Sequence, residues 1–214
     1  MKLVFFGPPG AGKGTQAAKL AESLGIPTIS TGHIIRQAIA DGTPVGKTAK
    51  EHINRGELLP DDVVAALVAE RIKEDDCQKG YILDGFPRTL VQAEMMDKSG
   101  ICVDLVIDIE VSDDAIVKRM SGRCVCDACG AAYHVIFNPS QKDGICDVCG
   151  ETLKTRDDDA PEVVLNRLEI YHKQTEPLKA YYQAQGKLVA INGEGSVDEI
   201  FEQVQKAALA KAGE

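Results

Sequence analysis

The chain has 214 residues, of which 44% are hydrophobic and 27% charged, and its net charge is −9. This composition is typical of a globular protein with a full apolar core. The acidic balance argues against general nucleic-acid binding, which relies on clustered Lys and Arg. No run of about 18 apolar residues is present, as a membrane-spanning helix would need. Only four apolar residues separate Lys2 from Gly7, too few for a signal peptide. We therefore expect a cytoplasmic protein without membrane or nucleic-acid partners.

The first sixty residues begin with a predicted strand over 2–7, an apolar run that ends in glycine. A helical pattern over 13–25 follows, and residues 26–30 read as extended. Two short helices are predicted over 32–42 and 46–56, and each of them also ends in glycine.

The middle of the chain continues the same alternation. A longer amphipathic helix is predicted over 61–76, and a strand over 81–86. A helix over 89–100 leads to an apolar strand over 104–111, which a helix over 113–121 follows.

The stretch 122–160 breaks this rhythm, because it is loop-like and its helical periodicity is weak. We interpret it as an insertion. At its end, "DAPE" (159–162) combines an Asp at the expected N-cap with a proline early in the helix and a Glu three residues on. A long helix is predicted from there to about residue 185, followed by a strand over 187–192 and a helix over 196–211.

Nearly continuous apolar strands that alternate with helices predict an α/β fold, with a five-stranded parallel sheet covered by helices on both faces. The first strand and helix are joined by "GPPGAGKGT" (7–15). Glycines let backbone N–H groups turn toward an anion, and a helix N-terminus adds partial positive charge. Lys13 supplies a full charge for the β- and γ-phosphates of a nucleotide, and Thr15 a hydroxyl.

Further motifs follow in a characteristic order. "STG" (30–32), Arg36, "DGFPRT" (84–89) and Gln92 come after the "GKGT" variant of the phosphate loop. As a set, these motifs resemble the adenylate kinases, and the resemblance covers the whole chain. It implies a P-loop nucleoside-triphosphate fold with a core of residues 1–29, 60–121 and 160–214, an AMP-binding helical insertion over 30–59 and a lid over 122–159. It also implies a monomer that binds ATP, AMP and ADP.

The resemblance implies roles for individual residues. Lys13, Arg88, Arg123, Arg156 and Arg167 would be catalytic. The ATP site would comprise Gly10, Ala11, Gly12, Lys13, Gly14, Thr15, Arg119, Arg123, Ala132, Tyr133 and Gly195. The AMP site would comprise Thr31, Arg36, Glu57, Leu58, Leu59, Gly85, Phe86, Pro87, Arg88, Gln92, Arg156 and Arg167. Asp84 would help to organise Mg²⁺ through water.

The residue types fit phosphoryl transfer to a phosphate. The second pKa of a phosphate monoester is about 6, so the attacking AMP phosphate is already deprotonated at neutral pH and needs no general base. What remains is charge neutralisation, positioning and exclusion of water. One position departs from the family, because His33 stands where an Asp usually follows "STG". It is either a tolerated substitution or a source of pH-dependent metal use.

The insertion carries "CDACG" (126–130) and "CDVCG" (146–150). Cys126, Cys129, Cys146 and Cys149 give the spacing C-x₂-C-x₁₆-C-x₂-C, typical of a structural zinc site, although iron or cobalt also fits such sites. Some adenylate kinases carry this ligand set in their lids. The chain has seven cysteines, an odd number that argues against a disulfide framework in a reducing compartment. Cys124 is a fifth thiol nearby that could compete for the metal, but the C-x₂-C geometry favours Cys126.

Two rival functions follow from the same features. Another nucleoside monophosphate kinase would act on GMP, CMP or UMP. A zinc-dependent nucleic-acid-binding protein would use the cysteine motifs as a finger, but residues 124–151 carry one Lys against three Asp and one Glu. A finger should be basic there. We therefore interpret the four cysteines as a structural clasp in a segment too small to build its own core.

Overall fold

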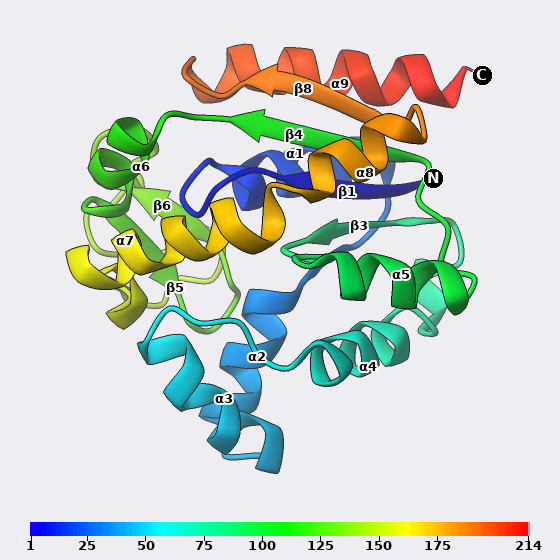
Figure 1. The fold of residues 1–214 in the computed structure, drawn as a ribbon. Helices are drawn as coiled ribbons and strands as arrows, with labels where there is room; N and C mark the ends of the chain where they lie inside the picture. The colour runs from blue at the N-terminus through cyan, green and yellow to red at the C-terminus, as the bar shows by residue number, and fades with distance from the viewer. Residues whose placement is uncertain (214) are drawn as a thin grey trace.

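The computed structural model describes residues 1–213 and contains the predicted parallel sheet (Figure 1). Five strands lie in the order β2-β3-β1-β4-β8, and all neighbouring strands are parallel. The strands are β1 (Lys2–Phe6), β2 (Thr28–Ser30), β3 (Tyr81–Asp84), β4 (Leu105–Glu110) and β8 (Leu188–Asn192). The sequence-based prediction of an α/β fold with five parallel strands is therefore confirmed.

Strand β1 lies at the centre of the sheet and is buried on both faces. Leu3 and Phe5 pack into one apolar cluster, and Val4 and Phe6 into the other. The first cluster is completed by α1 (Lys13–Leu24), α6 (Asp113–Met120), α7 (Pro161–Ile170) and α9 (Val197–Ala212). The second is completed by α2 (Thr31–Ala40), α3 (Pro44–Asn54), α4 (Asp61–Arg71), α5 (Leu90–Lys98) and α8 (Leu178–Ala184). No described helix is long and apolar enough to cross a membrane.

The strand register brings the carboxyl ends of the three central strands together. Phe5 pairs with Asp84 of β3, and Phe6 pairs with Asp108 of β4. The loops that leave these ends start side by side, as expected for a parallel sheet whose ligands bind beyond the carboxyl ends of its strands.

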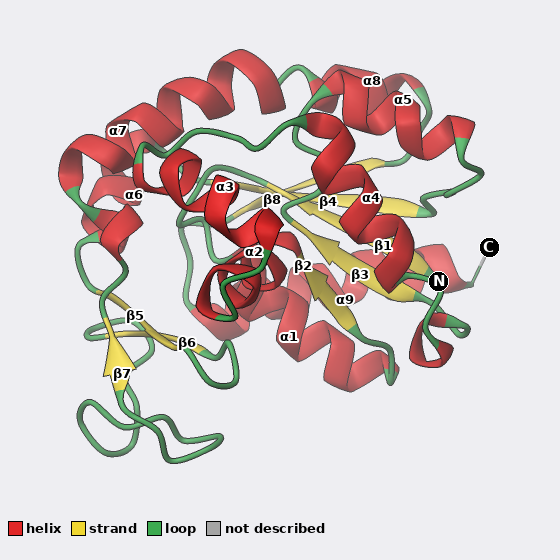
Figure 2. Ribbon diagram, turned by 90° about the horizontal axis from the view of Figure 1, so that it is seen from below, coloured by secondary structure: helices red, strands yellow, loops and turns green. Residues whose placement is uncertain are grey.

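The insertion at 122–160 contains a small sheet that the sequence analysis did not predict. Three antiparallel strands, β5 (Arg123–Cys126), β6 (Ala132–His134) and β7 (Leu153–Lys154), lie in the order β6-β5-β7. Figure 2 shows this sheet projecting from the helical layers. Strands of two to four residues are too short to produce a recognisable alternation of apolar and polar residues.

The long helix predicted to about residue 185 is interrupted. Helix α7 ends at Ile170, a π-helical turn covers Tyr171–Thr175, and α8 begins at Leu178. Glu176 N donates to Tyr171 O at 2.9 Å, a wider spacing than in an α-helix. Pro177 lacks an N–H and its ring crowds the preceding turn, which explains the interruption at this point.

One buried ion pair joins α8 to the sheet. Lys179 Nζ lies 2.7 Å from Asp108 Oδ2 and 3.1 Å from Glu110 Oε1. The Asp108 side chain is 0% exposed, and this burial raises its pKa although the Lys179 ammonium acts against the rise. Without the ammonium, a buried carboxylate would have no compensating charge.

We expect Lys179→Met to lower the free energy of unfolding at pH 7 by about 3 kcal/mol, because it leaves the Asp108 carboxylate buried and unpaired. Asp108 has a raised pKa in the folded state. The loss should therefore be complete above that pKa and shrink as the pH falls toward the ordinary carboxyl pKa. Urea unfolding at pH 7 and pH 5 measures both effects. Lys173→Met, at an exposed position nearby, is the matched control, and an equal loss in both variants would contradict the assignment.

Candidate functional site

The phosphate loop joins β1 to α1 and depends on its glycines. Gly7, Gly10 and Gly12 have φ values of 130°, 81° and 96°, which residues with a Cβ rarely adopt. A Cβ at Gly7 would overlap the carbonyl oxygen of Ile109, and one at Gly10 would lie 2.6 Å from Met120 Sδ. The loop therefore holds its backbone close to β4 and α6, with the N-terminus of α1 directed into the site.

Lys13 is the centre of the positive charge. Its Nζ donates to Gly7 O at 2.8 Å and to Pro8 O at 2.7 Å, so the side chain folds back over the loop. Burial lowers the pKa of Lys13 to about 8. Asp84 opposes this change, and Arg88, Arg167 and Arg123 add to it. The fold thus brings together side chains that lie up to about 150 residues apart in the sequence.

Two aspartates hold the arginines at the base of the lid. Arg123 binds Asp159 through two hydrogen bonds, one of them from Nε to Oδ2 at 2.7 Å. Arg167 Nη1 donates to Asp158 Oδ2 at 2.7 Å, and Arg156 Nε lies 3.7 Å from Asp158 Oδ1. Both carboxylates are nearly buried.

The predicted capping role of Asp159 is wrong. Helix α7 has Ala160 at its N-cap and no side-chain cap, because the Asp159 carboxylate binds Arg123 and Arg167 instead. The sequence analysis also missed Asp158. The available signal was the run of three aspartates directly after Arg156.

The pKa values reflect this crowding of charge. Burial works to raise the pKa of Asp158, but Arg167, Arg156 and Arg123 outweigh it and lower the pKa. Burial lowers the pKa of Arg167 to about 10, and the neighbouring Arg123 and Arg156 contribute to the shift. Asp158 therefore stays ionised between the arginines and reduces the repulsion among them.

The predicted AMP residues near β3 form one contact group. Thr31 Oγ1 donates to Gly85 O at 2.9 Å, and Arg88 Nε donates to the same oxygen at 2.8 Å. Gly85 has φ 81°, and a Cβ there would lie 2.8 Å from Arg88 Nη2. Arg36 lies one turn after Gly32 on α2, and its guanidinium packs against Gly32. Glycine at position 85 therefore allows Arg88 to turn back over the loop.

Three further predicted AMP residues, Glu57, Leu58 and Leu59, help to line a cavity of about 360 Å³. Phe86 is buried, as is Gln92. The Gln92 amide is already engaged, since Oε1 accepts from Arg88 N at 2.7 Å and Nε2 donates to Asp61 Oδ1 at 2.8 Å. These two bonds orient the amide and leave one N–H of Nε2 and one lone pair of Oε1 without a protein partner in this pair of contacts.

Arg119 connects the elements predicted to hold ATP. Its Nη2 donates to Gly193 O at 2.7 Å, and its Nη1 donates to Ala11 O at 3.4 Å. The phosphate loop, α6 and the loop that contains Gly195 therefore meet at one guanidinium. Tyr133 points elsewhere, because its hydroxyl lies 3.5 Å from Cys146 Sγ and accepts from Asp147 N at 2.8 Å. The ATP contacts of Ala132 and Tyr133 remain predictions.

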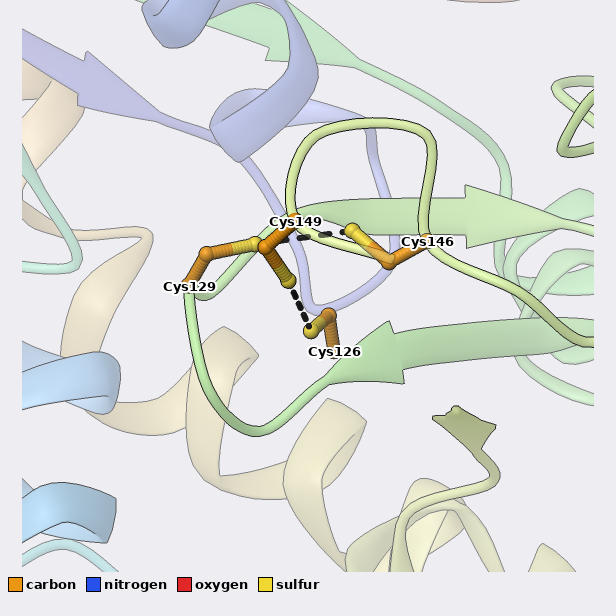
Figure 3. Close-up of side chains that lie close together, drawn as sticks. All are labelled: Cys126, Cys129, Cys146 and Cys149. Atoms are coloured by element: carbon orange, nitrogen blue, oxygen red, sulfur yellow. Dashed lines mark hydrogen bonds between the residues drawn. The ribbon is translucent and has the colours of Figure 1, made fainter. Parts of the chain in front are cut away.

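The four predicted metal ligands do come together (Figure 3). All four sulfur atoms lie within 4.8 Å of one another, with Cys126 and Cys149 at 3.4 Å and Cys129 and Cys146 at 3.5 Å. Sulfurs bonded tetrahedrally to one zinc ion at about 2.3 Å would lie about 3.8 Å apart, whereas a disulfide bond is about 2.0 Å long. The arrangement fits one metal ion, and Cys124 is outside the group.

The two cysteine motifs form equivalent turns. Gly130 N donates to Cys126 O at 2.9 Å, and Gly150 N donates to Cys146 O at 2.9 Å. Both glycines are left-handed, with φ values of 76° and 79°. Burial works to raise the pKa of the Cys146 thiol, but hydrogen bonds from Tyr133 and from two backbone N–H groups lower it. Burial raises the pKa of the Cys129 thiol. A backbone hydrogen bond works to lower the pKa of Cys149, but the neighbouring Cys126 raises it. Because the thiolate is the ligand, metal binding would release protons from these thiols.

Comparison with known proteins is consistent with this geometry. The family model described as adenylate kinase matches residues 5–187. The chain is 49% identical to an adenylate kinase of Methanosarcina barkeri, with 99% of each chain covered. It is 52% identical to one of Ruminiclostridium cellulolyticum, with 97% of this chain and 99% of the relative covered. It is also 51% identical to one of Thermodesulfovibrio yellowstonii, with 95% and 97% covered.

We expect the purified protein to carry one tightly bound metal ion per chain. Cys146→Ser should lose it, because three thiolates and a hydroxyl bind the ion more weakly, and the melting temperature should fall by about 5 °C or more. Phosphoryl-transfer activity measured in the cold should fall less, since the sulfur cluster contains no group that transfers phosphate. Elemental analysis, thermal melts and low-temperature assays test this.

The control for this experiment is Cys102→Ser, which removes an exposed thiol outside the cluster. It should keep both the metal and the melting temperature. Equal loss of stability and of turnover in Cys146→Ser would instead identify the metal as catalytic.

Proposed function

The chain belongs to the adenylate kinase family, and from this we propose that it catalyses reversible, Mg²⁺-dependent phosphoryl transfer from ATP to AMP, giving two ADP. The observation that carries the proposal is the convergence of Lys13 and the arginines. Arg88, Arg123 and Arg167 lie close enough to Lys13 to lower its pKa. Such a concentration of positive charge at the carboxyl ends of β1 and β3 is suited to several phosphates held in a row.

The chemistry needs positioning more than proton transfer. In the reaction, an AMP phosphate oxygen attacks the γ-phosphorus of ATP, and the bond from that phosphorus to the β–γ bridging oxygen breaks. The nucleophile is already anionic and the leaving group is ADP, so no base is assigned. Lys13 would bind the β- and γ-phosphates, while Arg36 and Arg88 would hold the AMP phosphate. Arg123, Arg156 and Arg167 would neutralise the charge between the two nucleotides.

Asp158 and Asp159 support these roles by holding the arginines before nucleotides arrive. Each carboxylate accepts from an arginine now and can share that arginine with a phosphate later. The guanidinium groups therefore need little reorganisation when the substrates bind, which lowers the cost of forming the charged complex.

The binding of magnesium with ATP is supported by Asp84. Asp84 Oδ2 would lie 3.4 Å from a Cβ added at Gly14. The residue after Gly14 is Thr15, which carries a hydroxyl. A carboxylate and a hydroxyl at the end of the phosphate loop suit a cation that keeps most of its water ligands. When bound, Mg²⁺ supplies charge neutralisation at the β- and γ-phosphates.

We assign three parts to the enzyme. The core comprises residues 1–29, 60–121 and 160–214, the AMP-binding part 30–59 and the lid 122–159. Arg123 and Arg156 lie at the two ends of the lid, so closure would bring them onto the phosphates and exclude water that would otherwise hydrolyse ATP. We assign zinc to the lid, because four thiolates in tetrahedral spacing are its usual structural ligands.

The function is tested by assaying ADP formation from ATP with AMP, GMP, CMP and UMP. We expect AMP to be the preferred acceptor. Lys13→Met should lower kcat at least about 100-fold, because it removes a charge that stabilises the transferring phosphoryl group. Its melting temperature should not fall, since burial makes the charged amine of Lys13 unfavourable in the parent.

Lys47→Met, at an exposed position on α3, is the control for loss of a lysine and should keep the parent activity. Near-parent turnover by Lys13→Met, or equal rates with all four acceptors, would refute the assignment.

The pH dependence follows from the pKa of Lys13, which is about 8. Phosphate binding needs the protonated amine. We therefore expect kcat/KM for ATP to be nearly constant from about pH 7, where the phosphates are deprotonated, to just below pH 8, and to fall as the pH rises beyond it. Bound polyphosphate stabilises the ammonium, so kcat should fall only at higher pH. In Lys13→Arg the alkaline decrease in kcat/KM should disappear, and a parent profile flat to pH 9.5 would contradict the prediction.

A further inference from the structure

The two cysteine turns are almost identical in sequence and backbone, but their surroundings differ. A Cβ added at Gly150 would meet no atom within 4 Å. One added at Gly130 would lie 2.9 Å from Nδ1 and 3.1 Å from Cε1 of His33. Metal binding alone does not explain this difference, because each turn contributes two sulfurs to the same cluster.

His33 belongs to the opposite side of the active site. It lies in the first turn of α2, two residues after Thr31, whose hydroxyl binds Gly85 O. The first cysteine turn connects β5 and β6, on the side of the lid that faces α2 (Figure 2). The imidazole therefore bridges the lid and the proposed AMP-binding part, beyond the arginines at the base of the lid.

The contact between His33 and Gly130 is of a kind that can open and re-form. His33 is half-buried and Gly130 keeps an exposed surface, so separating them leaves no large apolar area in water. The chain enters the lid near Arg123 and leaves it near Arg156. Because α2 is fixed to the loop after β3, lid opening would move the turn away from His33.

We infer that His33 and Gly130 form a docking contact that stabilises the closed lid, which makes His33 a positioning residue for phosphoryl transfer. The inference rests on the proposed function and assigns a second task to the metal centre. The ion and its four ligands would fix the shape of the turn that meets His33, while the equivalent turn around Gly150 would serve the metal alone. Glycine is required at position 150 for its backbone angle, and at position 130 for both the angle and the space.

Paired glycine substitutions test this. Gly130→Ala and Gly150→Ala impose the same backbone strain, but only the first places a methyl group against the imidazole. We expect Gly130→Ala to raise KM for ATP and AMP about tenfold over Gly150→Ala, with kcat changed less than about twofold. His33→Ala should also raise KM, by about threefold. The double variant His33→Ala/Gly130→Ala should match His33→Ala/Gly150→Ala, because the two carry the same backbone strain and no ring remains for the methyl group to meet.

His33→Asn should restore part of the affinity, because its planar amide reaches toward the position of Nδ1. Metal content and melting temperature are measured for every variant. If Gly130→Ala loses its metal, His33→Ala decides the question, because it alters no residue of the lid. Its amides over 126–130 should exchange faster with solvent than the parent amides when ADP is bound.

Equal KM values for the two glycine variants, additive effects in the double variant, or unchanged exchange in His33→Ala would each overturn the docking contact. A parent protein that forms no ADP would instead refute the proposed function. The exchange comparison between parent and His33→Ala does not depend on turnover, so the two failures are distinguishable.

Discussion

The arrangement of this protein depends on holding like charges together. Burial lowers the pKa of the Lys13 amine, and the nearby Arg88, Arg123 and Arg167 add to this change; in water these four cations would repel and disperse. Asp158, Asp159 and Asp84 reduce this repulsion without cancelling it. The site is therefore set up to accept anions, and the free energy released when phosphates bind includes relief of a repulsion that the fold already contains.

The fold supplies the force that keeps these charges in place. Strand β1 is buried on both faces, and its glycine-rich exit is held against β4 and α6 by contacts that only glycine permits. The buried Asp108–Lys179 pair fastens α8 to β4 of the same sheet, and the π-helical turn connects α8 to α7, which carries Arg167. Thr175, at the end of that turn, donates to Arg88 O at 2.8 Å. The charges of the site thus rest on apolar packing formed elsewhere in the chain.

Local signals in the sequence predicted what depends on local chemistry. The phosphate loop, the five strands and the four cysteines follow from glycine spacing, apolar runs and the C-x₂-C motifs. The features that were predicted wrongly or not at all have a common cause. Asp159 looks like a helix cap because its neighbours in the sequence favour one, yet an arginine 36 residues away competes for its carboxylate. The small lid sheet and the π-helical turn likewise depend on partners or backbone crowding that periodicity does not report. The residue-by-residue roles in nucleotide binding come from family resemblance and remain predictions.

The stability of the segment that carries the sulfur cluster and the stability of the core depend on different conditions. The core is held by two apolar clusters, and their contribution to the free energy of unfolding does not depend on the concentration of a metal ion. A segment closed by a bound ion obeys mass action instead. As long as free metal stays well above the dissociation constant of the folded site, and the unfolded segment binds none, each tenfold fall in free metal lowers the stability of the folded segment by about 1.4 kcal/mol. If the four sulfurs hold a metal ion as proposed, the ordered fraction of the lid depends on metal supply, and that of the core on temperature and solvent.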